Sequence, residues 1–198
     1  MSEQLLQNFD SIIDYCFRLF RDKNADYGPT WLLYRNSSLN DEIWRKAKRI
    51  RTLEEHGDAA CIAEGRDAEY VGIINYCVMF LMKLEGGLPG GEELVNDLSR
   101  LDELDEERLL KDYQKEAEAI RALLVRKNTD YGDAWKSMSL TSMTDQVIIR
   151  VYRIRKILSN GGACRVSEGI ASQLHDIINY CVFALIKMGT ELIPLQDE

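Results

Sequence analysis

The feature that most constrains this chain is an internal repeat with a fixed offset of 104 residues (127 minus 23). The segment 23–31, KNADYGPTW, falls on 127–135, KNTDYGDAW, and the six residues IINYCV occur at both 73–78 and 177–182. The register holds without a gap over most of the 198 residues. A chain that repeats itself in one register is expected to fold into two similar units.

The repeat sets the expected domain boundaries. A Gly-rich turn at 86–91 and an acidic stretch after it separate the two copies. We therefore expect a first unit over 1–94, a linker over 95–104 and a second unit over 105–198, packed as one globular body.

The hydrophobic periodicity within each unit is helical. Apolar residues recur at three-and-four spacing along 5–20 and 109–124, which is typical of amphipathic helices, and no segment alternates with period two for long. The sequence predicts an all-α fold: two tandem helical units, about three main helices each, related by a pseudo-two-fold axis.

The expected helix ends follow from capping and turn residues. The first helices are expected to stop at Asn24 and Asn128. The second helices are expected to start at N-caps, and the third helices to span 64–85 and 168–188. The expected N-cap candidates are Ser38, Asp41, Ser142 and Asp145.

Composition narrows the partners and the compartment. The 25 basic and 33 acidic side chains give a net charge of −8, which disfavours binding to a nucleic acid duplex. The most apolar windows, 71–84 and 177–188, are shorter than the roughly 20 residues that a membrane span needs, so no membrane partner is expected. Asp10 and Asp14 interrupt the apolar N-terminus, which argues against a secretory signal, and the five cysteines show no paired spacing. We expect a cytoplasmic protein with reduced thiols.

The most specific motif is K-N-x-D-Y-G-x-x-W, which follows the first helix of each unit. It places a cation, an amide, a carboxylate and two aromatic rings around a glycine bend. One interpretation is structural: the carboxylates cap local backbone, the glycines are left-handed and the tryptophans anchor the turn. The other is that the lysine contacts a phosphate. The candidate binding residues are Lys23, Asp26, Tyr27, Trp31, Lys127, Asn128, Asp130, Tyr131 and Trp135.

A polar seam on the third helix of the second unit is the other candidate for chemistry. Its residues, Glu168, Ser172, Asp176 and Asn179, share one helical face, which on the simplest interpretation is solvated. In the first unit, Glu64 and Asn75 keep the seam, whereas Ala68 and Gly72 stand at its middle positions. Groups that a metal ion could use are therefore expected in the second unit.

A metal site on this seam would need help from another element. Glu168 and Asp176 are separated by about 12 Å of helix rise, which is far for one shared ion. Asp130 and Glu118 are the candidates for a facing carboxylate. Oxygen ligands of this kind suit Mg²⁺ or Mn²⁺, ions that commonly accompany a phosphorylated substrate.

The second helices carry a basic pair in each unit, Lys46 with Arg49 and Arg150 with Arg153. These pairs either form salt bridges with the acidic excess or contact a phosphate. We expect the two turns to form the walls of one phosphate and base site, with Lys127 and Arg153 on the phosphates and Tyr131 or Trp135 against a ring.

At the K-N-x-D-Y-G-x-x-W turns, the R-I-R segments 49–51 and 153–155, and the third helices, the chain resembles the nucleotide modification associated domain family, type 1. Family members commonly carry an E-S-x-x-D-x-x-x-D-x-x-N-Y type of third helix. Glu168, Asp176, Asn179 and Tyr180 fall onto this pattern in the second unit, where Ser172 replaces the middle aspartate. In the first unit Glu64, Asn75 and Tyr76 match. The chain is also similar to MazG-like all-α nucleoside triphosphate pyrophosphohydrolases, although their paired E-x-x-E helix is absent.

Two functions follow as expectations. The first is a Mg²⁺-dependent enzyme, pyrophosphohydrolase-like, that acts on a nucleotide or similar small phosphate ester through Asp176 and Glu168. The alternative is a non-catalytic nucleotide-binding or scaffold protein with an eroded metal site. Association of the chain with further copies of itself is left open by the sequence.

Overall fold

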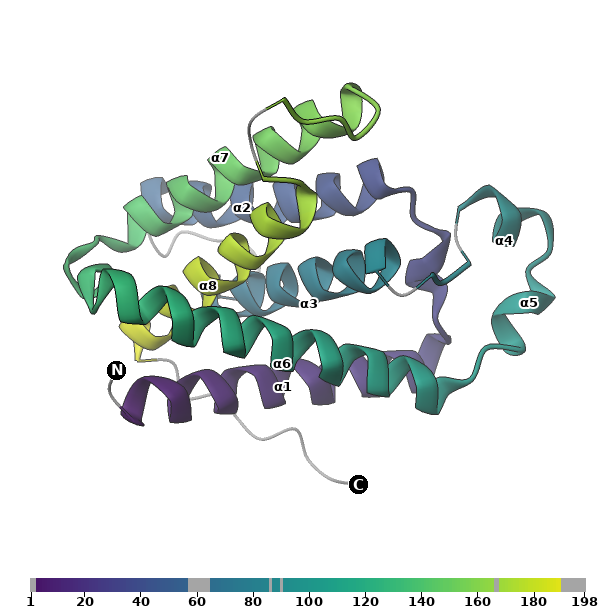
Figure 1. Cartoon of the computed structure of the whole chain (residues 1–198), viewed down its shortest axis with the longest axis horizontal. Helices are drawn as coiled ribbons and strands as arrows, with labels where there is room; N and C mark the ends of the chain where they lie inside the picture. Colours follow the sequence, from purple (N-terminus) through teal and green to yellow (C-terminus); the bar gives the residue numbers. More distant parts are fainter. Residues whose placement is uncertain (1–2, 57–64, 86, 90, 166–167, 190–198) are drawn as a thin grey trace.

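A computed structural model describes residues 3–56, 65–85, 87–89, 91–165 and 168–189. Over these residues the chain is all-α, as the periodicity predicts, and no strand is present. The first unit comprises α1 (Glu3–Tyr27), the 3-10 turn η1 (Thr30–Leu33), α2 (Asn36–His56) and α3 (Arg66–Glu85). The second comprises α6 (Glu106–Tyr131), η2 (Ala134–Ser137), α7 (Leu140–Ser159) and α8 (Ile170–Met188). Two short helices, α4 (Glu92–Asn96) and α5 (Ser99–Asp102), connect them (Figure 1).

Equivalent helices of the two units pack against each other, α1 with α6, α2 with α7 and α3 with α8. The ion pairs across α2 and α7 are reciprocal: Arg51 lies 3.8 Å from Asp145, and its repeat counterpart Arg155 lies 2.9 Å from Asp41. Exposed pairs of this kind contribute little stability. Their reciprocity, however, is what a two-fold relation between units produces, because each partner then meets the other's equivalent.

The antiparallel course of α1 and α6 separates the two turns. The helices lie side by side and run in opposite directions, so their C-terminal ends are at opposite ends of the molecule (Figure 1). η1 follows the end of α1 and η2 follows the end of α6. Each turn is therefore placed beside the helices of its own unit.

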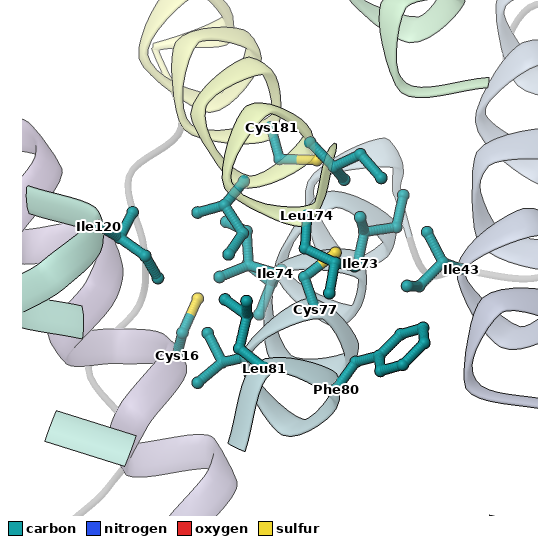
Figure 2. Close-up of a cluster of buried hydrophobic side chains, with 14 of the residues drawn as sticks. Cys16, Ile43, Ile73, Ile74, Cys77, Phe80, Leu81, Ile120, Leu174 and Cys181 are labelled. Atoms are coloured by element: carbon teal, nitrogen blue, oxygen red, sulfur yellow. The ribbon is translucent and has the colours of Figure 1, made fainter. Parts of the chain in front are cut away.

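The hydrophobic core lies where α3 and α8 cross between the outer helices. Figure 2 shows Ile73, Ile74 and Cys77 of α3 facing Leu174 and Cys181 of α8, and each of these five side chains is fully buried. Both third helices are apolar on several faces because each is covered by its partner and by the flanking helices. The expected amphipathic stripes thus form one continuous core that both units share.

The cysteines that the structure describes form no disulfide. Cys16, Cys77, Cys164 and Cys181 are free, and Cys61 lies outside the described residues. Burial raises the pKa of the Cys16, Cys77 and Cys181 thiols well above the ordinary range. These three side chains are inert core groups.

The predicted ends of the first helices are wrong by about one turn. Both helices continue through the K-N-x-D-Y segment, to Tyr27 and Tyr131, and in α1 the Asn24 side chain donates to the Phe20 carbonyl at 2.8 Å. They end at Gly28 and Gly132, whose φ angles of 64° and 58° are easily adopted only by glycine. The left-handed glycines of the structural interpretation are therefore present.

The predicted N-caps are also displaced. α7 is capped by Ser139, whose hydroxyl accepts from the Ser142 N–H at 3.1 Å. The four expected candidates, Ser38, Asp41, Ser142 and Asp145, all lie inside α2 or α7. The third helices start at Arg66 and Ile170, two residues after the expected positions.

A lysine at the end of each third helix fixes the 3-10 turn of its unit. Lys83 donates to the carbonyls of Leu32 and Tyr34, and Lys187 donates to the carbonyl of Lys136 at 2.7 Å. Burial lowers the pKa of Lys83, but its acceptors satisfy the ammonium. The sequence reasoning missed this pair, although the identical residue at the repeat offset is a signal that could have revealed it.

No helix of the described residues is long and apolar enough to cross a membrane.

The shared core yields a stability prediction. Ile178→Ala removes a fully buried side chain of α8, so we expect the free energy of unfolding to fall by about 2–5 kcal/mol in urea denaturation. Ile149→Ala, on the exposed face of α7, is the matched control and should change it by no more than about 0.5 kcal/mol. Equal effects of the two substitutions would contradict the core assignment.

Candidate functional site

Each unit encloses a pocket between its three main helices and its 3-10 turn. The first pocket, of about 580 Å³, is lined from α1, η1, α2 and α3, and the second pocket, of about 500 Å³, from α6, η2, α7 and α8. Every residue that lines the second pocket, apart from Glu168, has its repeat counterpart in the lining of the first. The counterpart of Glu168 is Glu64, which lies outside the described residues. Two equivalent pockets are therefore built from the same positions of the repeat.

The structure brings most of the expected site residues to these two pockets. The second is lined by Lys127, Asn128, Trp135, Glu168, Asp176, Asn179 and Tyr180, and the first by Lys23, Tyr27, Trp31, Asn75 and Tyr76. The pockets share no lining residue, and the C-terminal parts of α1 and α6 that contribute to them lie at opposite ends of the molecule (Figure 1). The two turns therefore do not form the walls of one site, because the antiparallel first helices separate them.

Several expected residues lie elsewhere. Asp26 and Asp130 are exposed and line neither pocket, and Arg49 and Arg153 are also absent from both linings. The i, i+3 spacing of the basic pairs puts only the first member of each, Lys46 or Arg150, toward a pocket. The side chain of Tyr131 lies outside the described part of the structure.

A cluster of three charged side chains forms one end of the second pocket. Lys127 donates to the Oδ1 atom of Asp176. Arg150 donates to the other carboxylate oxygen, Oδ2, from its Nη2 at 2.9 Å and from its Nε at 3.0 Å. Arg150 also lies over the Tyr180 ring, with its guanidinium carbon 4.8 Å from the ring centroid. The Asp176 carboxylate is thus held between two cations, of which Lys127 is the more accessible, with 35% of its side chain exposed.

These residues do not fit a divalent metal ion as they stand. Both oxygens of Asp176 already bind cations, and the Glu168 carboxylate accepts from Ser172. Glu118 lines a separate hollow between α1 and α6. Within the described residues, no group of three or more His, Cys, Asp or Glu side chains could hold a metal. The Mg²⁺ or Mn²⁺ site stays a prediction that this arrangement of side chains does not support.

The carboxylate that binds the basic residue of the second helix occupies different positions of the repeat in α3 and α8, one helical turn apart. In α8 the pair is Gln173 and Asp176, whereas the counterpart positions in α3 are Glu69 and Gly72. Glu69 accepts from Lys46 at 3.2 Å and also pairs with Arg49. Its side chain is only 4% exposed and does not line the first pocket. The carboxylate that faces the pocket in the second unit is therefore moved away from the pocket in the first.

An aromatic wall forms the other side of the second pocket. The rings of Trp135 and Phe183 are stacked, with centroids 4.6 Å apart and planes inclined by 5°, and Tyr180 meets Phe183 edge-on. The first unit has Met79 in place of Phe183. Aromatic walls of this kind accept planar ligands through stacking and edge contacts.

Two polar groups on the wall of the second pocket have no partner among the described residues. They are the Trp135 indole N–H and the Asn179 side-chain oxygen, and Asn179 as a whole is only 5% exposed. In the first unit the equivalent groups are satisfied: Trp31 donates to Asn24 at 3.1 Å, and Asn75 accepts from the Tyr113 hydroxyl at 2.7 Å.

The difference at the asparagine has a simple cause. The repeat counterpart of Tyr113 is Phe9, which has no hydroxyl to donate to Asn179. A buried polar group without a partner costs about 1–3 kcal/mol, so the Asn179 oxygen is a group in the pocket lining that an added partner would stabilise.

The structure also adds residues that the sequence reasoning missed. Arg150 was recognised as part of a basic pair but Arg153 was preferred, and Phe183 was not singled out. Glu69 was overlooked because its counterpart Gln173 is neutral. For Arg150, the spacing from Asp176 gives no signal, since the two lie on different helices.

The fold and the pockets define a class: a helical protein of two pseudo-symmetric units, each with an aromatic and charged pocket beside a glycine-terminated helix. The family described as nucleotide modification associated domain 1 matches the chain twice, over 23–84 and 127–188, which together cover more than half of the sequence. The chain belongs to this family, as two tandem copies. Comparison with curated proteins and with solved structures finds no match.

The contrast between the two asparagines is testable through stability. Asn75→Ala leaves the buried Tyr113 hydroxyl without an acceptor, whereas Asn179→Ala removes an oxygen that has no partner. We expect Asn75→Ala to lower the free energy of unfolding by about 1–3 kcal/mol more than Asn179→Ala does, in urea denaturation without ligand. Equal losses would mean that Asn179 has a partner in the folded chain.

Proposed function

We propose that this protein binds a nucleotide, or a similar small phosphate ester with a planar ring, in its second pocket. The observation that carries the proposal is that two residues of the pocket lining each have a buried polar atom without a partner among the described residues, the Trp135 N–H and the Asn179 oxygen. One is a donor and the other an acceptor. The edge of a nucleobase offers both complementary groups, and the Trp135 and Phe183 rings offer an apolar surface for its face.

The charged end of the pocket supports a phosphate contact. Lys127 and Arg150 both bind Asp176, while Glu168, the other carboxylate of the lining, accepts from Ser172 instead. Arg150 uses its donors on Asp176 and Gln146, whereas Lys127 is partly exposed and has donors left for a ligand. Lys127 is therefore the residue proposed to meet the phosphate.

The first test is calorimetric titration with adenosine 5′-monophosphate (AMP). Lys127→Met should weaken binding at the second pocket by about 10-fold to 150-fold, which corresponds to the roughly 1.5–3 kcal/mol of a hydrogen bond to a charged group. Lys111→Met, on the same helix but 69% exposed and outside both pockets, is the matched control and should leave affinity unchanged. Equal affinities of all three proteins would refute the assignment.

A second candidate function is the Mg²⁺-dependent, pyrophosphohydrolase-like enzyme that the MazG-like resemblance implies. One observation favours it: Glu168 and Asp176 line the same pocket as the proposed phosphate contact. For an ion to bind there, Asp176 would have to leave Lys127 and Arg150. Binding without catalysis needs no such change, and we therefore prefer it.

Asp176→Asn discriminates between the two functions. If the pocket only binds, removal of the carboxylate frees Lys127 and Arg150, and AMP affinity should rise at least about fivefold, since one charge at 4 Å contributes roughly 1 kcal/mol even in water. If the pocket is a metal-dependent active site, the same variant should lose Mg²⁺-dependent product formation from nucleoside triphosphates. We expect the rise in affinity, with the thermal melt recorded in parallel to exclude unfolding.

A further inference from the structure

We infer that the first pocket is a separate ligand site, which binds an aromatic compound carrying a phosphate directly through lysine, without a divalent cation. This inference does not depend on the function proposed for the second pocket. The two pockets are lined by equivalent positions of the repeat, but the charged residues at these positions differ.

The cations of the first pocket are not neutralised on its wall. Lys23, Arg45 and Lys46 line it, and Asp67 is the one carboxylate among the described lining residues. Arg45 pairs with Glu42 at 2.7 Å and Lys46 with the buried Glu69, neither of which lines the pocket. Lys23 makes no hydrogen bond or ion pair with any residue that the structure describes. Its ammonium is therefore available to an anion.

Gly72 explains why Lys23 differs from its counterpart Lys127. In the second unit this position is Asp176, which binds Lys127. A Cβ atom added at Gly72 would lie 2.6 Å from the Cε and 2.7 Å from the Nζ of Lys46, so the lysine side chain occupies the place of the missing carboxylate. The first pocket therefore lacks the carboxylate of Asp176 and has the Lys46 ammonium at that position instead. This difference in charge favours the binding of a phosphate.

More aromatic residues line the first pocket than the second. The rings of the first pocket are Tyr15, Phe20, Tyr27, Trp31, Tyr34 and Tyr76. Tyr34 and Tyr76 meet edge-on at 6.3 Å, and Tyr27 is 68% exposed on its rim. Burial raises the pKa of Tyr76, which keeps its phenol protonated and able to donate. A ring held by these side chains would place a phosphate substituent within the cationic part of the lining.

The polar amide and indole of this pocket are not free to select a ligand. Trp31 donates to Asn24, and the Asn75 oxygen accepts from Tyr113. Recognition in the first pocket therefore depends on charge and ring contacts, whereas in the second it depends on hydrogen bonds to a base edge. A pocket of about 580 Å³ has the volume of a small-molecule site and accommodates a nucleoside monophosphate.

The test compares AMP with adenosine in calorimetric titrations that contain EDTA. To isolate the first pocket, the background protein carries Lys127→Met and Asn179→Ala. We expect this background to bind AMP at one site, and to bind adenosine at least about tenfold more weakly, because the phosphate contact is charge-assisted.

Two variants in that background probe the charge argument. Lys23→Met removes the unpaired cation, and Gly72→Asp restores the carboxylate of the second unit while displacing only the flexible end of Lys46. Each should weaken AMP binding by about tenfold or more and leave adenosine binding unchanged. Lys111→Met is the control that should have no effect.

The outcomes separate this inference from the proposed function. AMP binding in the background that is insensitive to both Lys23→Met and Gly72→Asp would overturn the inference. A strict requirement of AMP binding for Mg²⁺ would also overturn it. A third contrary result is a background protein that binds no AMP, while the parent protein binds one equivalent of AMP and loses that binding with Lys127→Met. If the parent protein instead loses all binding with Lys23→Met and none with Lys127→Met, the inference stands and the proposed function of the second pocket fails.

Discussion

The burial of α3 against α8 is the interaction on which the rest of this structure depends. Both helices are apolar on faces that no single unit can cover, so the third helix of each unit completes the core of the other. Burial of such side chains contributes about 1.5–3 kcal/mol each. The pairing also fixes the pseudo-two-fold relation, and that relation sends the two glycine-terminated first helices in opposite directions (Figure 1). The existence of two separate pockets follows from the core.

The periodicity and the repeat were sufficient to predict the fold. Helical spacing along 5–20 and 109–124, and the single repeat register, led to an all-α chain of two units, because these patterns reflect which faces must be buried. The ends of the helices were predicted less well from the same patterns. In α1 the helix passes Asn24, whose side chain donates to the Phe20 carbonyl, an interaction that forms only once the helix exists.

The sequence identifies residues that line the pockets, but it does not reveal that they are divided between two separate pockets. Lys127 and Trp135 of the turn motif line the second pocket, whereas the sequence reasoning expected both turns in one site. A repeat says that two segments are alike and does not say how far apart they lie. The choice between Arg150 and Arg153 likewise depended on the angle between α7 and α8, which is a tertiary property.

The asymmetry between the pockets can be explained by what each unit does with its polar residues. In the first unit the buried groups are paired internally, with Asn75 on Tyr113 and Trp31 on Asn24, so they stabilise the fold. In the second pocket Phe9 of α1 offers no hydroxyl to Asn179, and Trp135 is stacked on Phe183. The Asn179 oxygen and the Trp135 N–H are buried there without a partner among the described residues.

The charges are arranged in the opposite sense. The second unit pairs its lysine, Lys127, with Asp176, whereas Lys23 of the first has no acidic partner among the residues that the structure describes. Residues that break a local rule of satisfaction tend to mark functional positions, because the stability they cost is otherwise unexplained. The second pocket breaks that rule, because two buried hydrogen-bonding groups have no partner among the described residues. Lys23 of the first pocket is exposed, so water solvates its charge and its lack of an acid costs no stability. On the proposals made above, the two pockets built from one repeat would select their ligands differently, the second through hydrogen bonds to a base edge and the first through charge and ring contacts.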